Sequence, residues 1–170
     1  RNKFTGRQLS GKKLLVIGLG RIGSEVAKRA RAFGMEVVAY DPYIPHTKAD
    51  SLHVDLMNDL EGAVSLADMV TIHTPLTEET ANMIDESMLR VFKHGAYLVN
   101  CARGGIVDEA AVAQAVREGR IDGFATDVYS AEPLKPGHPF LAEDIADRIV
   151  ITPHIGANTV EAQSEVSRIA

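Results

Sequence analysis

The stretch that decides the fold is Gly-Leu-Gly-Arg-Ile-Gly at residues 18–23, which stands between an apolar run and an amphipathic one. The run Lys-Leu-Leu-Val-Ile at residues 13–17 predicts a buried strand, and the residues after the stretch show helical spacing of apolar side chains. In such a turn Gly18 permits the tight bend, and Gly20 lets the backbone approach a pyrophosphate. Gly23 permits close packing of the helix on the strand. The stretch therefore predicts a dinucleotide-binding unit, whose helix N-terminus offers N–H groups and partial positive charge to phosphates.

An acidic residue, Asp41, ends the next apolar run at residues 36–40, about 20 residues after the glycines. At that position a carboxylate can accept hydrogen bonds from both adenosine ribose hydroxyls. The same charge repels a 2′-phosphate, and no arginine follows directly to neutralise one. The alternative interpretation is a solvated turn acid before Pro42, which the spacing disfavours. The sequence predicts NAD, rather than NADP, as the cofactor.

Length and composition indicate one globular domain. The chain has 170 residues, of which 45% are hydrophobic and 24% charged. No apolar run reaches the roughly 18 residues that cross a bilayer, so no membrane association is expected. The net charge of −5 and the scattered basic residues give no footprint for nucleic acid. The single cysteine, Cys101, excludes an internal disulfide and suits a reducing, cytoplasmic location.

Periodicity predicts strands that alternate with helices. The helix at residues 21–33 places Ile22, Val26, Ala30 and Phe33 on one face, before Gly34 ends it. Further strands are predicted at residues 37–40, 69–73, 96–100, 123–128 and 149–152; helices at residues 57–65, 108–118 (with Gly119 as the C-cap) and 160–170; and a proline-containing loop after residue 41. This order predicts an α/β fold, a doubly wound parallel sheet of the Rossmann type covered on both sides.

In open parallel sheets, ligands bind outside the carboxyl ends of the strands. The residues that follow the predicted strands are the glycine-rich turn, Asp41, residues 73–75 (His-Thr-Pro), residues 101–105 (Cys-Ala-Arg-Gly-Gly), Asp127 leading to Glu132, and residues 154–157 (His-Ile-Gly-Ala). One edge thus collects an arginine, a carboxylate and a histidine beside the cofactor site. Oxidation of a hydroxy acid needs a carboxylate anchor, a proton acceptor and a group that orients the acceptor, and this set matches those needs.

The chain resembles the NAD-binding domain of the D-isomer-specific 2-hydroxyacid dehydrogenases over nearly its whole length. The motifs that carry the resemblance are GLGRIG at 18–23, HTPLT at 73–77, NCARG at 100–104, VDE at 107–109, TDVY at 126–129, EP at 132–133 and PHIG at 153–156. Several such motifs in one order are far more specific than any single one.

The resemblance implies a catalytic set of Arg103, Glu132 and His154. The planar fork of Arg103 would hold the substrate carboxylate and carbonyl oxygen. His154 would take the hydroxyl proton as hydride leaves for the nicotinamide, and Glu132 would bond its far ring nitrogen and favour the protonated imidazole. For each residue alone, a surface charge or a satisfied histidine is the simpler interpretation, but three such residues at adjacent strand ends favour the catalytic one.

The expected cofactor-binding residues are Gly18, Gly20, Arg21, Ile22, Gly23, Asp41, Thr74, Pro75, Cys101, Ala102, Arg103, Asp127, His154, Gly156 and Ala157. For Asp127, which the resemblance places at the nicotinamide carboxamide or ribose, a role as a helix or turn cap stays open. Cys101 is expected to pack against the nicotinamide rather than act as a nucleophile. The other histidines show no ligand spacing, so no metal site is predicted. The acidic pair at residues 78–79 is interpreted as a solvated face.

The resemblance also implies that the chain is a fragment of a two-domain enzyme. Residues 1–12 would be a connector from a substrate-binding domain, residues 13–157 the NAD-binding Rossmann domain, and residues 158–170 a helix returning toward the missing domain. The expected substrate is a 2-hydroxy or 2-oxo acid. Residues 154–163 resemble the D-3-phosphoglycerate dehydrogenases, and family members suggest a homodimer through this domain. The alternative from another class is a non-catalytic NAD-sensing module of the corepressor type.

Overall fold

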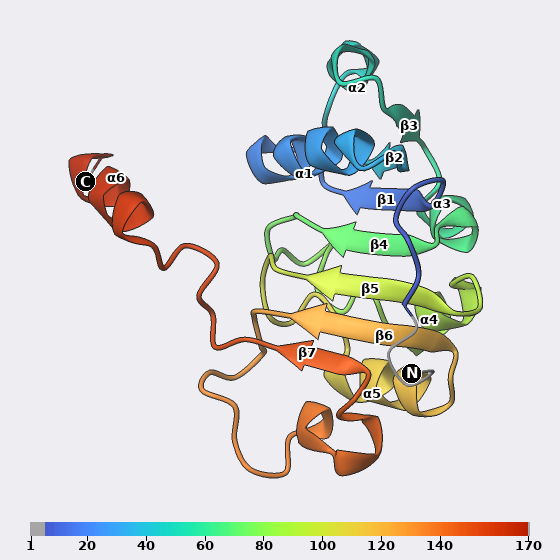
Figure 1. The fold of residues 1–170 in the computed structure, drawn as a ribbon, viewed down its shortest axis with the longest axis vertical. Coiled ribbons are helices and arrows are strands. Elements are labelled where there is room, and N and C mark those ends of the chain that lie inside the picture. Colours follow the sequence, from blue (N-terminus) through green and yellow to red (C-terminus); the bar gives the residue numbers. More distant parts are fainter. Residues whose placement is uncertain (1–5, 170) are drawn as a thin grey trace.

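A computed structural model of the chain describes residues 6–169, and the side chains of residues 6–164. Its centre is a seven-stranded sheet in the order β3-β2-β1-β4-β5-β6-β7, in which every neighbouring pair is parallel (Figure 1). The strands are β1 (Lys13–Ile17), β2 (Glu36–Tyr40), β3 (Asp55–Met57), β4 (Met69–Ile72), β5 (Ala96–Asn100), β6 (Ile121–Thr126) and β7 (Ile149–Ile151). The strand order reverses at β1, whose neighbours are β2 and β4. The predicted doubly wound, Rossmann-type sheet is confirmed.

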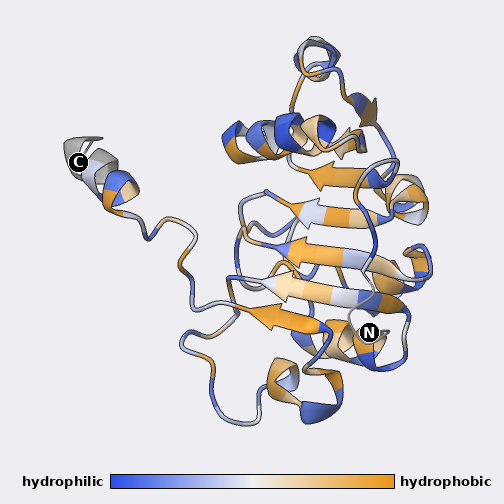
Figure 2. Ribbon diagram, in the orientation of Figure 1, coloured by the Kyte–Doolittle hydropathy of each residue, from blue (hydrophilic) through white to orange (hydrophobic). Residues whose placement is uncertain are grey.

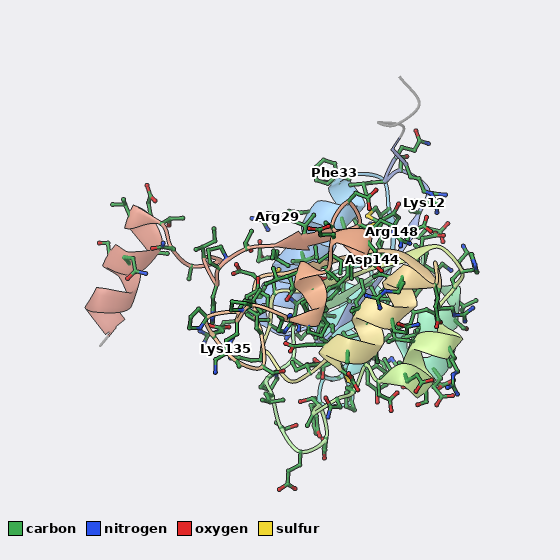
Figure 3. The ribbon with its side chains drawn as sticks, turned by 90° about the horizontal axis from the view of Figure 1, so that it is seen from below. Lys12, Arg29, Phe33, Lys135, Asp144 and Arg148 are labelled. Atoms are coloured by element: carbon green, nitrogen blue, oxygen red, sulfur yellow. The ribbon has the colours of Figure 1, made fainter. Side chains whose placement is uncertain are left out.

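Helices connect the strands and cover the sheet. They are α1 (Arg21–Ala32), α2 (His46–Ser51), α3 (Leu60–Leu66), α4 (Glu86–Val91), α5 (Glu109–Arg117) and α6 (Val160–Ile169), with short 3-10 turns η2 (Pro139–Leu141) and η3 (Glu143–Ile145). The helix α6 follows β7 and projects away from the body of the domain (Figures 1 and 3). The structure describes no helix that is long and apolar enough to span a bilayer.

Two hydrophobic clusters lie on opposite faces of the sheet, because successive residues of a strand point to opposite sides. Leu14 and Val16 of β1 pack with Ala27 and Ala30 of α1. The alternate residues of β1 pack in the larger cluster, which includes residues of α3, α4 and α5. The strands are accordingly apolar along most of their length (Figure 2).

The cover of the sheet on the α1 side thins toward β7. Val16, Thr71, Val99, Ala125 and Val150 form one row across β1, β4, β5, β6 and β7. Val16 is fully buried, Val99 and Ala125 are half-buried, and Val150 is 63% exposed. As far as residues 6–164 show, the sheet is therefore flanked by helices on both faces at β1, and on the α1 side its edge strand β7 is exposed at Val150.

The buried face of α1 differs from the predicted one. Ile22 and Phe33 are 67% and 66% exposed, and the helix instead buries Gly23, Ala27 and Ala30. Small residues face the sheet because α1 lies so close to β1 that a Cβ on Gly23 would stand 2.0 Å from the carbonyl oxygen of Gly18. Phe33 lies at the surface at the end of α1 (Figure 3). The packing role assigned to Gly23 therefore matches the structure. The periodic apolar pattern was right for Ala30 and for Val26, which packs against the same cluster, and wrong for Ile22 and Phe33.

Other differences concern element boundaries. Residues 42–56, expected as a loop, contain α2 and most of β3. The helix expected at residues 57–65 begins only at Leu60, because Asp59 is its N-cap and accepts a hydrogen bond from Gly62 N. The helix α5 ends with Glu118 as its C-cap, and Gly119 is the next residue, with φ 70°. Residues 1–5 of the expected connector and residue 170 of the last helix lie outside the described residues.

Candidate functional site

The glycine-rich turn joins β1 to α1 at the carboxyl edge of the sheet. Gly18 has φ 89°, and a Cβ there would stand 2.8 Å from the backbone oxygen of His73, so this turn accepts only glycine. Gly20 caps α1, and a Cβ at this residue would meet no atom within 4 Å. The turn thus leaves open space over the helix N-terminus, as a phosphate-binding backbone requires. Arg21 and Ile22 follow in the first turn of α1, and both are exposed.

A cavity of about 750 Å³ lies beside this turn, at the point where the strand order reverses. Its walls come from the ends of β1, β2 and β4 and from the loops after β2 and β4; the lining residues include Gly18, Gly20, Asp41, Tyr43, His73, Thr74, Pro75, Glu78 and Glu79. Ligands of open parallel sheets bind at such a switch point.

Asp41 connects the glycine-rich turn to the end of β2. Its Oδ2 accepts a hydrogen bond from Leu19 N at 2.9 Å, and its Oδ1 accepts one from Tyr43 N at 3.0 Å. A carboxylate has about four acceptor positions, so each oxygen can accept one more hydrogen bond. Because Asp41 also lines the cavity, its free positions fit a pair of ribose hydroxyls.

The mouth of the cavity is acidic. Glu78 and Glu79 are exposed, as expected, but they also line the cavity together with Asp41. The Tyr43 hydroxyl donates a hydrogen bond to Glu79, and this bond and the Glu79 charge raise the pKa of Tyr43. None of the described lining residues is lysine or arginine. This charge distribution disfavours a ligand that carries an extra phosphate at this end.

Thr74 supplies a polar atom without a protein partner. Its Oγ1 is buried, and no described residue hydrogen-bonds to it. A buried hydroxyl that stays unpaired costs roughly 1–3 kcal/mol, so a ligand group at this position would relieve the cost. His73 beside it is held differently: burial lowers the pKa of its ring, Nε2 lies 3.0 Å from Thr71 Oγ1, and its backbone N–H donates to Ile17. The open Gly20 backbone, Asp41 and Thr74 together fit a dinucleotide.

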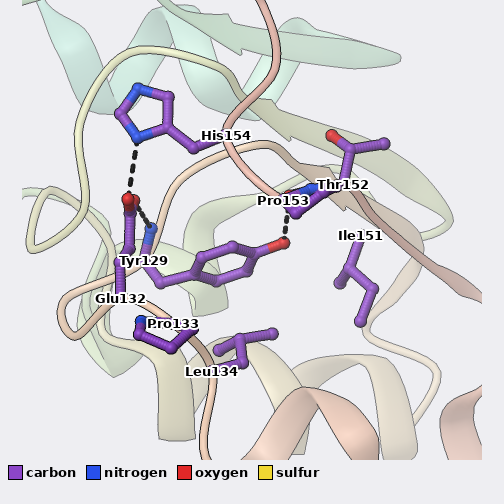
Figure 4. Close-up of a pocket in the computed structure, with 8 residues that line it drawn as sticks. All are labelled: Tyr129, Glu132, Pro133, Leu134, Ile151, Thr152, Pro153 and His154. Atoms are coloured by element: carbon purple, nitrogen blue, oxygen red, sulfur yellow. Dashed lines mark hydrogen bonds and ion pairs between the residues drawn. The ribbon is translucent and has the colours of Figure 1, made fainter.

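The carboxyl ends of β6 and β7 bring Glu132 and His154 together. Glu132 Oε2 lies 2.8 Å from His154 Nδ1, and Glu132 Oε1 accepts from Tyr129 N at 3.2 Å (Figure 4). The hydrogen bond from His154 holds the pKa of Glu132 below its usual value. No described residue bonds His154 Nε2, which leaves this nitrogen able to exchange a proton with a ligand.

Arg103 follows β5, the next strand of the sheet. Its side chain is exposed and its Nη1 donates to Ala102 O at 2.6 Å, and no described bond joins it to Glu132 or His154. The backbone of its loop is nevertheless fixed beside them, because a Cβ on Gly104 would stand 1.8 Å from the carbonyl oxygen of Tyr129. The structure therefore places the Arg103 loop against the loop that carries Glu132, and apart from the bond to Ala102 O no described residue accepts a hydrogen bond from the guanidinium.

Asp127 organises the turn that carries His154. Its buried carboxylate accepts hydrogen bonds from Thr152 Oγ1 at 2.5 Å, Ile155 N at 2.9 Å and Gly156 N at 2.7 Å. Burial alone raises the pKa of Asp127, but these bonds and the charge of His154 outweigh it and hold the pKa below its usual value. The structure thus shows the capping arrangement, whereas the expected contact with a cofactor stays a prediction.

The turn holds His154 in an uncommon conformation. Its φ is 54°, in the left-handed region that costs non-glycine residues of the order of 1 kcal/mol. The three bonds to Asp127 hold the residues on both sides of His154, and so maintain this conformation. Gly156 and Ala157, expected at the cofactor, are exposed in the same turn.

Cys101 and Ala102 begin the loop after β5. Burial, with the nearby charge of Asp127, raises the pKa of the Cys101 thiol, which argues against a nucleophilic thiolate. Ala102 N donates to Asn100 Oδ1 at 3.1 Å, which shapes this loop. Within residues 6–164, no group of three or more potential ligands could hold a metal ion.

Sequence reasoning missed the residues that support the site. Tyr129 bonds Glu132 through its backbone, and its hydroxyl donates to Thr152 O at 2.6 Å (Figure 4). The motif TDVY at 126–129 contained the tyrosine, but its role depends on a residue 23 positions later in the chain, and local spacing gives no signal for such a contact.

Comparison with known proteins identifies relatives over nearly the whole chain. The family model described as "D-isomer specific 2-hydroxyacid dehydrogenase, NAD binding domain" matches residues 1–156. D-3-phosphoglycerate dehydrogenase of Methanocaldococcus jannaschii is 46% identical, over 99% of this chain and 32% of the relative. The Bacillus subtilis protein of the same name is 42% identical, over 98% of this chain and 31% of the relative. The chain thus spans about a third of these relatives.

Solved structures of similar proteins have the same fold. D-lactate dehydrogenase from Aquifex aeolicus, solved with NAD and lactic acid, superposes with a TM-score of 0.87 at 31% identity, over 98% of this chain and 53% of that one. A glyoxylate reductase from "Paecilomyes thermophila" superposes with a TM-score of 0.86 at 32% identity, over 96% of this chain and 48% of that one.

The bonds to Asp127 predict how stability depends on pH. Because its folded pKa is lowered, Asp127 contributes stability that is fully present above the unfolded pKa near 4 and is lost as pH falls through the folded value. Asp127→Asn should lower the free energy of unfolding at pH 7 by about 1–3 kcal/mol, since an amide N–H then faces backbone donors. Urea unfolding at several pH values should also show that the free energy of unfolding of Asp127→Asn falls less below about pH 4 than that of the unaltered chain.

The exposed pair Asp144–Arg117 offers a matched control. Asp144→Asn removes an acid at the surface and should change stability little at pH 7. If Asp127→Asn behaved like this control, the three bonds to the turn would not contribute to folding.

Proposed function

The chain belongs to the D-isomer-specific 2-hydroxyacid dehydrogenases, and on that premise we propose that it is the NAD-binding part of an enzyme that transfers a hydride between a D-2-hydroxy acid and NAD. The observation that carries the proposal is the 2.8 Å contact between Glu132 and His154, at the same edge as the glycine-rich turn. A histidine paired through one nitrogen and free at the other is arranged for proton transfer.

The cofactor would lie along the carboxyl edge. The N–H groups above Gly20 would hold its pyrophosphate, Asp41 its adenosine ribose and Thr74 Oγ1 a polar group between them. NAD supplies the nicotinamide ring that accepts the hydride. The acidic cavity mouth supports NAD over NADP, because a 2′-phosphate there would face Asp41, Glu78 and Glu79.

The protein side chains would handle the proton and the substrate. His154 Nε2 would take the proton of the substrate hydroxyl as the C2–H bond breaks, and the electron pair of the O–H bond would form the second bond of the new C2 carbonyl. Glu132 accepts from Nδ1, which fixes the tautomer and stabilises the imidazolium that forms. The fork of Arg103 would pair with the substrate carboxylate in a bidentate contact, through the guanidinium N–H groups that no described residue accepts.

The preferred substrate to test is 3-phosphoglycerate. Similarity to D-3-phosphoglycerate dehydrogenases over nearly the whole chain supports this choice. Because the chain spans about a third of those relatives, we propose that a second, substrate-binding domain closes on the nicotinamide. A homodimer through this domain and a cytoplasmic location complete the proposal, and both stay predictions.

Cofactor choice can be tested on the 170-residue chain. Titration calorimetry should find NAD bound at least about tenfold tighter than NADP, or about 1.4 kcal/mol. Asp41→Ala should narrow this difference, mainly by weakening NAD binding, since the ribose bonds are lost. Gly20→Ala is the matched control: it should weaken both cofactors about equally and leave the ratio unchanged, because its methyl group would occupy the pyrophosphate space. Equal affinities of the unaltered chain for NAD and NADP would contradict the assignment of Asp41.

The acid–base pair can be tested by pH–rate profiles of the complete enzyme that contains this chain. His154→Ala should lower kcat by roughly 10²–10⁴, the usual range for a general acid–base group. Glu132→Gln should shift the profile for hydroxy-acid oxidation to lower pH, because a neutral amide stabilises the imidazolium less than a carboxylate does. An unmoved profile would remove Glu132 from the mechanism. NAD binding with no turnover of any 2-hydroxy acid by the unaltered enzyme would instead favour an NAD sensor.

A further inference from the structure

A second carboxylate–histidine pair lies behind the first. Glu109, the first residue of α5, has Oε2 3.0 Å from His138 Nε2, and both side chains are mostly buried, at 15% and 13% exposure. Its other oxygen, Oε1, accepts from Ser130 N at 2.7 Å. One carboxylate therefore contacts the first and last residues of the segment 130–138, which we call the Glu132 loop.

The protonation of His138 follows from its neighbours. The backbone N–H of Phe140 can only donate, and it lies 3.3 Å from His138 Nδ1, so Nδ1 is the acceptor. Nε2 therefore carries the proton that is donated to Glu109. The ring packs edge-on against Tyr129 and tilted against Phe140, with centroids 6.2 Å and 4.9 Å apart. His138 is thus held by contacts to four residues, Glu109, Phe140, Tyr129 and, through its backbone, Lys135.

Between its two ends the Glu132 loop has little support of its own. Its residues are exposed apart from Leu134, which is half-buried, and His138, and Leu134 packs against the larger hydrophobic cluster. Within the described residues, the only bond from the loop to His154 is the one from Glu132, and Glu132 is further held only by Tyr129 N. Segments with few buried contacts open readily unless their ends are fixed.

We propose that Glu109 and His138 are positioning residues that clamp both ends of the Glu132 loop and thereby hold Glu132 against His154. This proposal rests on the proposed function, in which the Glu132–His154 pair transfers the proton. The clamp acts through the backbone at Ser130 and through the ring of His138, and neither residue touches the reacting atoms.

A purely structural role for the clamp makes a different prediction. If Glu109 and His138 only stabilised the fold, losing them would lower the free energy of unfolding and leave the Glu132–His154 contact as it is. If they position Glu132, their loss must change the charge that His154 experiences. Glu132 contacts His154 directly, and Asp127 and Tyr129 lie near it. Asp127 is fixed separately by its three bonds to the turn, and burial raises the pKa of Tyr129, which keeps its hydroxyl uncharged. The contact with Glu132 is therefore the part of the His154 surroundings that loss of the clamp would change.

Two variants of His138 separate these roles. His138→Gln places an amide N–H where Nε2–H stood and can still donate to Glu109, whereas His138→Leu retains an apolar side chain and removes the donor. The titration of the His154 ring can be followed by NMR of its ring protons in the 170-residue chain. In the His138→Leu variant this titration should shift to lower pH by about 0.5 unit or more, as expected when a neighbouring negative charge moves away. His138→Gln should titrate close to the unaltered chain. In the complete enzyme, His138→Leu should lower kcat about tenfold with little change in the substrate KM.

Further variants keep the test decisive. Glu109→Gln removes the carboxylate of the Glu109–His138 pair. This variant is used in place of His138→Leu if the His138→Leu chain does not fold. Asp144→Asn removes an acid that pairs with the other end of α5 and should leave the His154 titration unmoved. Loss of stability with an unmoved His154 titration in both clamp variants would overturn the proposal. Glu132→Gln is the reference: if it also left the titration unmoved, the Glu132–His154 pair itself, and with it the proposed function, would fail.

Discussion

The fold depends on one geometric constraint, namely that all described strands run parallel. Every strand then ends at the same edge, and the reversal of strand order at β1 opens a cavity there. Two glycines make this arrangement possible: Gly23 lets α1 lie directly on the end of β1, and Gly18 lets the turn before α1 lie against the backbone of His73 at the end of β4. A Cβ at either position would stand less than 3 Å from a backbone oxygen. The same contact that packs the helix therefore places its N-terminus at the ligand edge.

The edge divides into two ends with different support. At one end, the glycine-rich turn, Asp41 and Thr74 surround a cavity whose mouth is acidic. At the other, Glu132 and His154 come from two loops that have few contacts of their own and are held by Asp127, Tyr129 and Glu109. Residues that support the site outnumber those that would touch a substrate, as expected where a site must be held within fractions of an ångström.

Local patterns predicted the parts of the structure that local physics determines. The glycine spacing gave the turn, and the alternation of strands and helices gave the sheet. The short strand β3 was missed, because three residues carry no periodic signal. Ile22 and Phe33 were placed on the wrong face, since close packing against β1 selects small side chains over large apolar ones. The Glu109–His138 pair could not be found from spacing, because its members lie 29 residues apart on a helix and a loop.

The central claim is that one edge of this sheet holds NAD with its nicotinamide end beside His154. A crystal structure of the chain with NAD tests it most directly. We expect electron density for the pyrophosphate over Gly20, for the adenosine ribose at Asp41, and for the nicotinamide between the Cys101 loop and His154. Density for the dinucleotide at any other surface, or with the nicotinamide directed away from His154, would contradict the account.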